Sequence, residues 1–268
     1  MFDLHTHHDR CGHAAGSLED YIQEAIRKGL PILGISDHSP YFFSWENHPY
    51  PQLAMAAAEF DVYIEEAVRL KRAYEQQIEL LIGVESDIFS DQIDLYGRKY
   101  AQYPIDYVIG SIHFLSSAAI MDALDFNTAS EEQQQIAVKR YVEVMMLGIE
   151  SHWVQIVGHL DGFKRGYPGF RNLLSPYIDG ILKRMADRGV AMEVNTNGMQ
   201  HACQEWYPSN DVIERALFHG VHITFGSDAH HPERIASDWK RVREALLAIG
   251  YKRMVVYKER KPHFLHLK

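Results

Sequence analysis

Short apolar runs alternate with amphipathic segments along the whole chain. A short, continuous apolar run is typical of a buried parallel strand, whereas apolar positions that recur every three or four residues predict a helix. The expected strands cover residues 3–7, 32–35, 78–84, 107–112, 154–157, 190–194 and 222–225, followed by a late strand at 254–257. The expected helices cover residues 21–28, 59–76, 91–100, 131–149, 173–187, 211–218 and 239–249.

The regular alternation of strand and helix implies parallel βαβ units with right-handed crossovers. Seven such units fit a closed barrel better than an open sheet, although eight is the usual number. We therefore expect an α/β fold, a distorted (β/α)7 TIM-like barrel that forms a single domain over residues 1–268. A doubly wound open sheet is the alternative, but the first strand lacks the Gly-x-Gly-x-x-Gly turn that would support it.

The composition is that of an ordinary soluble protein, with 46% hydrophobic and 24% charged residues. No apolar run approaches the roughly 20 residues of a membrane helix, and the N-terminus has no signal-peptide pattern, so we expect a cytoplasmic protein without membrane contact. The net charge of -9 argues against a nucleic-acid partner. It allows a small anionic substrate, because bound cations would reverse the local field. The sequence predicts no particular oligomeric state.

Histidine, aspartate or glutamate stands at or just after nearly every predicted strand. His5 and His7 lie two apart on an extended segment, so their side chains share one face. The candidates are His5, His7, His38, Glu85, His113, His159, Asn195, Asp228 and His230, joined by His13 from the loop after the first strand. In a barrel these positions meet at the C-terminal mouth. Without Asn195 they exceed the three or four ligands of one zinc ion, and they suit two or three ions bridged by a carboxylate.

The motifs around these residues resemble those of the PHP (polymerase and histidinol phosphatase) family, and within it the histidinol-phosphatase branch. The matching pieces are Asp-Leu-His5-Thr-His7, Cys11-Gly-His13, Ser-Asp-His38, Gly-Val-Glu85, Gly-Ser-Ile-His113, Gly-His159-Leu-Asp and Gly-Ser-Asp228-Ala-His230. They span nearly the whole chain in the family's order. The set is specific, although no single piece is.

The resemblance implies a distorted (β/α)7 barrel with three divalent metal ions, for which Zn, Mn and Fe are equally suited by imidazole and carboxylate ligands. Carried over by resemblance, one ion takes His5, His7, Glu85 and Asp228, a second takes His13, His38 and His230, and a third shares Glu85 with His113 and His159. The residues expected to be catalytic are Glu85, Asp228 and His230.

Clustered divalent ions suit the hydrolysis of phosphate monoesters, because they bind phosphate oxygens, lower the pKa of a bound water and stabilise the leaving alkoxide. A cationic side chain should also meet the phosphate. Lys164, Arg165 and Arg234 follow predicted strand ends, and Arg165 is favoured because a guanidinium matches phosphate geometry. Arg10, between predicted ligands, is a further candidate. The general acid is either a metal-bound water or Asp161.

Several other residues have two open interpretations. Asn195 and Asn197 either hydrogen-bond a substrate or ligand, or serve a turn. Cys11 is either a ligand or, more readily, a small buried packing residue. His201 and His231 lie close enough to strand ends to touch a substrate. The aromatic loop at residues 41–51 either covers the site or packs on the barrel.

The predicted function is therefore a metal-dependent phosphatase for a small phosphate monoester, first of all L-histidinol phosphate in histidine biosynthesis. A PHP phosphoesterase for a nucleotide, a sugar phosphate or phosphotyrosine is the main alternative. An amidohydrolase-type barrel also begins with His-x-His, but it commonly bridges two metals with a modified lysine, and no lysine stands at a predicted strand end. A metal-binding protein without catalysis is the remaining alternative.

Overall fold

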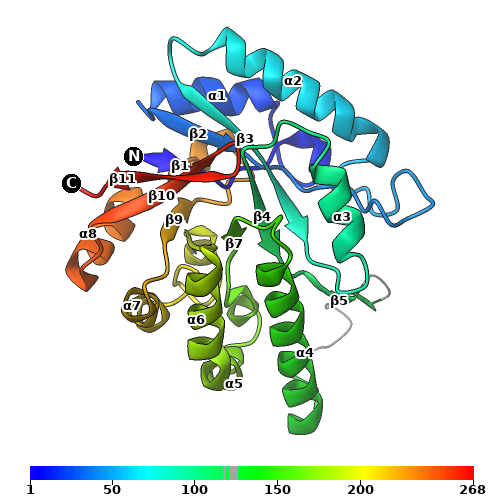
Figure 1. Cartoon of the computed structure of the whole chain (residues 1–268), viewed down its shortest axis with the longest axis vertical. Coiled ribbons are helices and arrows are strands. Elements are labelled where there is room, and N and C mark those ends of the chain that lie inside the picture. Colours follow the sequence, from blue (N-terminus) through cyan, green and yellow to red (C-terminus); the bar gives the residue numbers. More distant parts are fainter. Residues whose placement is uncertain (117–118, 121–125) are drawn as a thin grey trace.

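Seven parallel strands form the centre of the molecule, in a computed structural model that describes residues 1–116, 119–120 and 126–268 (Figure 1). Their order in the sheet follows their order in the chain. The strands are β1 (Phe2–Asp3), β2 (Ile32–Ile35), β3 (Glu79–Asp87), β4 (Tyr107–Ser111), β7 (Ile156–Val157), β8 (Ala191–Asn195) and β9 (Ile223–Gly226). This order is the one that right-handed βαβ units produce when each strand is laid beside its predecessor.

The first and last strands of the sheet also meet. The Leu4 amide donates to the carbonyl of Phe225 at 3.1 Å, and the His7 amide donates to the carbonyl of Ala229 at 2.9 Å. The sheet therefore closes into a barrel, as the sequence predicts. β1 is shorter than the expected strand, and the residues after it are held against the segment after β9 by the isolated pairing of Thr6 with Ala229.

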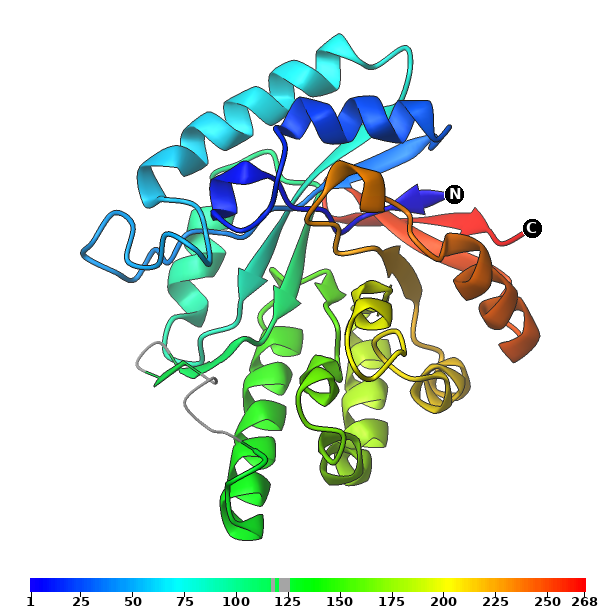
Figure 2. The same ribbon diagram turned by 180° about the vertical axis from the view of Figure 1, so that it is seen from behind.

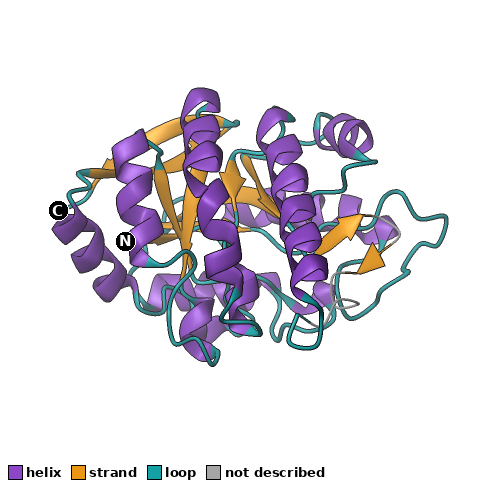
Figure 3. Cartoon of the chain, turned by 90° about the horizontal axis from the view of Figure 1, so that it is seen from below, coloured by secondary structure: helices purple, strands orange, loops and turns teal. Residues whose placement is uncertain are grey.

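Helices surround the barrel on the outside (Figures 2 and 3). They are α1 (Leu18–Arg27), α2 (Phe60–Ala73), α3 (Ile93–Tyr100), α4 (Glu131–Glu150), α5 (Phe170–Leu174), α6 (Ile178–Arg188), α7 (Asn210–His219) and α8 (Trp239–Ile249). The helix expected at 173–187 is instead split into α5 and α6, because Pro176 lies between them and cannot continue the hydrogen-bond ladder. None of the helices that the structure describes has the length and hydropathy needed to cross a membrane.

A hairpin of β10 (Arg253–Lys258) and β11 (Lys261–His266) follows the barrel. The late strand at 254–257 is thus confirmed, while its partner β11 was not expected, because most of its side chains are exposed and it has no continuous apolar run. The Arg260 amide donates to the carbonyl of Asp106 just before β4, and the Tyr257 hydroxyl donates to the carbonyl of Gly189 just before β8. The hairpin therefore covers the end of the barrel where the strands begin. A smaller hairpin pairs β5 (Phe114–Ser116) with β6 (Ala119–Ile120).

The ring of Tyr107 crosses the barrel interior. This residue at the start of β4 is fully buried, and its hydroxyl donates to the carbonyl of Leu4 at 2.6 Å. Gly34 in β2 and Gly83 in β3 leave the room for it, since a Cβ on Gly34 would lie 2.0 Å from the Tyr107 Oη and one on Gly83 would lie 2.4 Å from the Tyr107 Cζ. The two glycines are thus required by packing.

We predict that Gly34→Ala destabilises the protein by about 1–3 kcal/mol, because the added methyl group collides with both Tyr107 and the backbone of Leu4. Urea unfolding at a fixed metal concentration measures this change. Gly180→Ala is the matched control, because a Cβ at this position in α6 meets nothing within 4 Å and the substitution should stabilise the helix by roughly 0.5–1 kcal/mol. Equal stability of Gly34→Ala and the wild type would contradict this account of the interior.

Candidate metal centre

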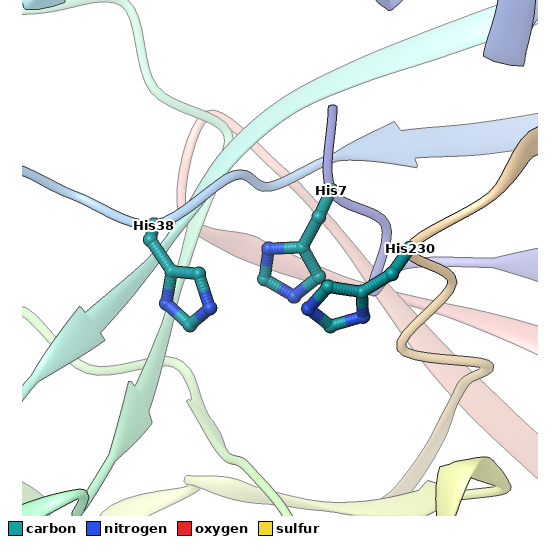
Figure 4. Close-up of side chains that lie close together, drawn as sticks. All are labelled: His7, His38 and His230. Atoms are coloured by element: carbon teal, nitrogen blue, oxygen red, sulfur yellow. The ribbon is translucent and has the colours of Figure 1, made fainter. Parts of the chain in front are cut away.

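Imidazoles from separate segments gather at the end of the barrel where the strands finish. His7 follows β1, His38 follows β2 and His230 follows β9, and in Figure 4 their rings face the same space. The ring of His7 stacks on those of His38 and His230, with 4.3 Å between ring centroids in both pairs. The His13 ring, from the loop before α1, lies 4.8 Å from His230 and 5.1 Å from His38. Segments far apart in sequence thus form one cluster.

Glu85 lies at the middle of this cluster and is 2% exposed. Its Oε2 atom lies 3.0 Å from Nδ1 of His38, 3.3 Å from Nε2 of His5 and 3.5 Å from Nε2 of His7. Its Oε1 atom lies 2.9 Å from Nε2 of His159 and 3.8 Å from Nε2 of His113. The two oxygens therefore face two different groups of imidazoles. β3 continues to Asp87, so Glu85 lies within the strand rather than at its end.

Asp228 is the second acid of the cluster. Its Oδ1 atom lies 3.0 Å from Nε2 of His7 and 3.8 Å from Nε2 of His5. It has φ 53, a left-handed conformation that aspartate adopts more readily than most residues. The side-chain amides of Asn195 and Asn197 donate to its Oδ2 atom at 3.3 and 3.2 Å. Both asparagines thus orient a member of the cluster, which is one of the two roles considered from the sequence.

The imidazoles and carboxylates of the cluster are the donor set of a divalent metal centre, and two of the imidazole nitrogens are left without another partner in the part of the chain that the structure describes. Nε2 of His5 and Nε2 of His7 are buried and find no hydrogen-bond partner among the described residues. A buried polar nitrogen without a partner is costly unless another group, such as a metal ion, satisfies it. Sets of donor atoms within 4.8 Å of one another include His5, His7 and Asp228, then His7, His38 and His230, and also His38, Glu85 and His113. All nine residues predicted as ligands lie in this one region.

Three further carboxylates hold the outer nitrogens of the imidazoles. Glu193 Oε1 lies 2.6 Å from Nδ1 of His5, Asp37 Oδ1 lies 3.2 Å from Nδ1 of His7, and Asp87 Oδ1 lies 3.0 Å from Nδ1 of His113. A carboxylate at the far nitrogen fixes the orientation and tautomer of a ligating imidazole. These three acids were not predicted from the sequence. A signal existed for Glu193, which is an acid inside an otherwise apolar strand and two residues before Asn195.

The charges of the cluster shift the pKa values of its imidazoles in opposite directions. Burial disfavours the charged form of His7, but the neighbouring carboxylates of Asp228 and Asp37 outweigh it and raise the pKa of His7 to about 9. Burial, followed by electrostatic repulsion from the rings of His38 and His7, lowers the pKa of His13 to about 4. Burial would raise the pKa of Glu85, yet the surrounding imidazoles hold it well below its usual value. Burial would likewise raise the pKa of Asp228, but His5, His7 and His230 hold it well below its usual value, so both acids of the cluster are carboxylates.

A cavity of about 730 Å³ opens beside the cluster. Arg165 and Arg234 line it, as do His201 and His231, so these four lie where a bound molecule would be. From the aromatic loop only the first residue, Tyr41, lines the cavity, whereas Trp45 is 92% exposed.

Lys164 does not line the cavity, and its contacts do not favour the prediction that it binds substrate. Its amino group is buried and donates to Asp161 Oδ2 at 3.0 Å, to Glu205 Oε2 at 3.1 Å and to the carbonyl of Trp206 at 2.9 Å. Asp161, one of the two candidates for a general acid, is occupied by the same contact and by the Ser209 amide. It does not line the cavity either.

Two other candidates also lie away from the cavity. The guanidinium of Arg10 pairs with Glu66 on α2 at 2.5 Å. Cys11 is fully buried, its thiol donates to the carbonyl of His8, and burial raises its pKa, which opposes the thiolate form that a ligand needs. Small buried packing is therefore the better interpretation of Cys11.

A family model, that of the PHP domain, matches residues 3–197. The chain belongs to the PHP domain family. The match covers most of the barrel and seven of the nine predicted ligands. Asp228 and His230 lie beyond the matched residues, and closure of the barrel brings them to the centre of this PHP domain.

Relatives of this PHP domain extend over nearly its full length. A probable histidinol-phosphatase of Deinococcus radiodurans is 28% identical over 262 residues, which cover 97% of this chain and 98% of that protein. The histidinol-phosphatase of Bacillus subtilis is 26% identical and covers 85% of this chain and 92% of that protein. The crystal structure of histidinol phosphate phosphatase from Lactococcus lactis, in complex with zinc, L-histidinol and phosphate, shares the fold with a TM-score of 0.79, 20% identity and 98% coverage of both chains.

Proposed function

We propose that this PHP domain is a metal-dependent phosphatase that hydrolyses L-histidinol phosphate to L-histidinol and phosphate. The observation that carries the proposal is the cluster of seven imidazoles and two carboxylates beside a cavity lined by two arginines. Similarity over 97% and 85% of this chain to two proteins named as a probable histidinol-phosphatase and a histidinol-phosphatase supports the substrate. A cytoplasmic location and a role in histidine biosynthesis remain predictions that accompany this proposal.

The nine residues would hold three divalent ions, with Zn, Mn and Fe as candidates. His5, His7 and Asp228 would share one ion with Glu85. His13, His38 and His230 would hold the second, and His113 and His159 would hold the third, again with Glu85. The contacts of the two Glu85 oxygens with different imidazoles support a bridging role for this carboxylate.

Bound divalent ions would supply a Lewis acid that neutralises phosphate oxygens and lowers the pKa of an attacking water. Arg165 and Arg234 would bind the non-ester oxygens, since a guanidinium offers paired donors that match a phosphate. Asn195 and Asn197 would keep Asp228 in place through its second oxygen. Glu193, Asp37 and Asp87 would keep three imidazoles in the correct orientation.

Turnover of L-histidinol phosphate by metal-replete protein, measured beside AMP, a sugar phosphate and phosphotyrosine, tests the substrate. We predict that kcat/KM for L-histidinol phosphate exceeds that for each other monoester by at least about tenfold, because specific contacts to the leaving group contribute differences of this size. A preference for AMP, the sugar phosphate or phosphotyrosine would replace the substrate while keeping the phosphatase. Absence of turnover with all four would contradict the proposed function itself.

A further inference from the structure

The buried ammonium of Lys164 joins two walls of the cavity. Lys164 belongs to the short turn η4 (Gly162–Arg165), which follows the predicted ligand His159 and ends in Arg165. The ammonium donates across to the carboxylate of Glu205 and the carbonyl of Trp206, in the segment after β8. A lysine that is 3% exposed and has three acceptors holds both segments in one geometry, because the buried ammonium cannot replace a lost contact with water.

Each of the two segments that Lys164 joins also contributes a residue to the lining of the cavity. On one side, the residue after Lys164 is Arg165, whose side chain lines the cavity. On the other, Tyr207 follows Trp206 and lines the cavity too, with the Lys164 ammonium 5.4 Å from its ring centroid. The backbone of Tyr207 pairs with that of Asn195 through hydrogen bonds of 2.7 and 2.8 Å. The Asn195 side chain then donates to Asp228.

Asp161 is the third acceptor of the Lys164 ammonium and connects it to a further part of the chain. Its Oδ2 atom accepts from the Lys164 ammonium and from the Ser209 amide, which lies just before α7. The same carboxylate oxygen therefore ties the turn after β7 to the start of the helix after β8. Two backbone segments, at 161–165 and 205–209, converge on a single buried ion pair.

We propose that Lys164 is a positioning residue, which fixes Arg165 and the Tyr207 wall at the separation that a bound phosphate requires. It acts through these neighbours and does not itself touch the substrate. That the bound ligand is phosphate follows from the proposed function, and this part of the inference rests on it. The order that Lys164 imposes on the two segments can be measured without any ligand.

Amide hydrogen exchange of the intact protein, in Lys164→Met beside the wild type, tests this order. We expect peptides covering 159–166 and 203–209 to exchange at least about tenfold faster in the variant, while peptides from β2 and β3 keep their protection. Lys183→Met is the matched control, since that lysine is exposed and, among the residues that the structure describes, pairs only with Asp187 one turn away on α6. Unchanged exchange in both segments would overturn the proposal.

Binding of inorganic phosphate to zinc-loaded protein, measured by calorimetry, tests the link to Arg165. Lys164→Met and Arg165→Ala should each weaken phosphate binding by roughly 10- to 100-fold, and the double variant should lose clearly less than the product of the two single losses. Lys164→Arg should recover part of the loss. Independent effects that multiply in the double variant, or wild-type affinity in Lys164→Met, would overturn the positioning role.

Glu205→Gln covers the case in which Lys164→Met does not fold. Its side chain is 47% exposed, and the change weakens one arm of the junction without removing the buried ammonium. The same two segments should show a smaller increase in exchange, and unchanged exchange would overturn the proposal. If the wild type does not bind phosphate while exchange responds as expected, the proposed function fails and the structural role of Lys164 stands.

Discussion

Replacing Glu85 by glutamine should abolish most of the activity. Glutamine keeps the shape of the side chain but removes the charge and turns one of the two oxygens into an NH2 group. Five imidazole nitrogens lie within 3.8 Å of the Glu85 oxygens, so the carboxylate balances charge for the entire cluster. We expect kcat/KM to fall by roughly 10²–10³-fold or more, a loss typical of removing a group that stabilises developing charge. Metal content, measured by elemental analysis, should fall as well.

Glu150→Gln is the control for the chemistry of this exchange. Glu150 pairs with Arg184 and Arg188 on the outer surface, away from the cavity. The kcat/KM of the Glu150→Gln variant should therefore stay within about twofold of that of the wild type. A folded Glu85→Gln protein with the metal content and kcat/KM of the wild type would show that Glu85 is not a bridging ligand.

The barrel could be predicted because local patterns and general topology rules act in the same direction. Apolar runs specified the strands, and right-handed crossovers left few ways to arrange them. The failures occurred where burial does not follow sequence periodicity. β11 is mostly exposed and lacks an apolar run, and the break between α5 and α6 depends on Pro176 within an otherwise helical pattern. β1 is short because the residues after it form no continuous ladder with any neighbouring strand that the structure describes; Thr6 pairs with Ala229 through an isolated bridge.

The inner residues of the cluster could be predicted for a related reason, since strand ends in a barrel converge whatever the loops do. The outer residues could not. Glu193 and Asp37 matter because they lie next to His5 and His7 in space, and no spacing in the sequence encodes that contact. For Lys164, the sequence suggested a role at the site that its contacts in the fold do not support. Beside Arg165 it has the sequence features of a second phosphate ligand, yet the fold turns its amino group toward a buried acid.

Removal of divalent metal should abolish hydrolysis and also destabilise the fold. Buried Nε2 atoms of His5 and His7 lack hydrogen-bond partners among the described residues, and the two carboxylates of the cluster, Glu85 and Asp228, are buried beside them. A ligand that binds only the folded state, at about 1,000 times its Kd, stabilises it by roughly 4 kcal/mol. For a chain of this size, that corresponds to a fall in Tm of roughly 8–16 °C on chelation.

Thermal unfolding before and after dialysis against a chelator measures this fall in Tm. When Zn, Mn or Fe is then added back separately, the metal that the site prefers should restore both Tm and turnover. The Glu85→Gln variant provides the internal comparison, because a protein that has lost its bridging carboxylate should lose much less Tm on chelation than the wild type does. A wild-type protein shown by elemental analysis to be metal-free, yet unchanged in Tm and activity, would mean that the imidazole cluster is stable by its own hydrogen bonds. The chemistry at the barrel mouth would then have to come from side chains alone.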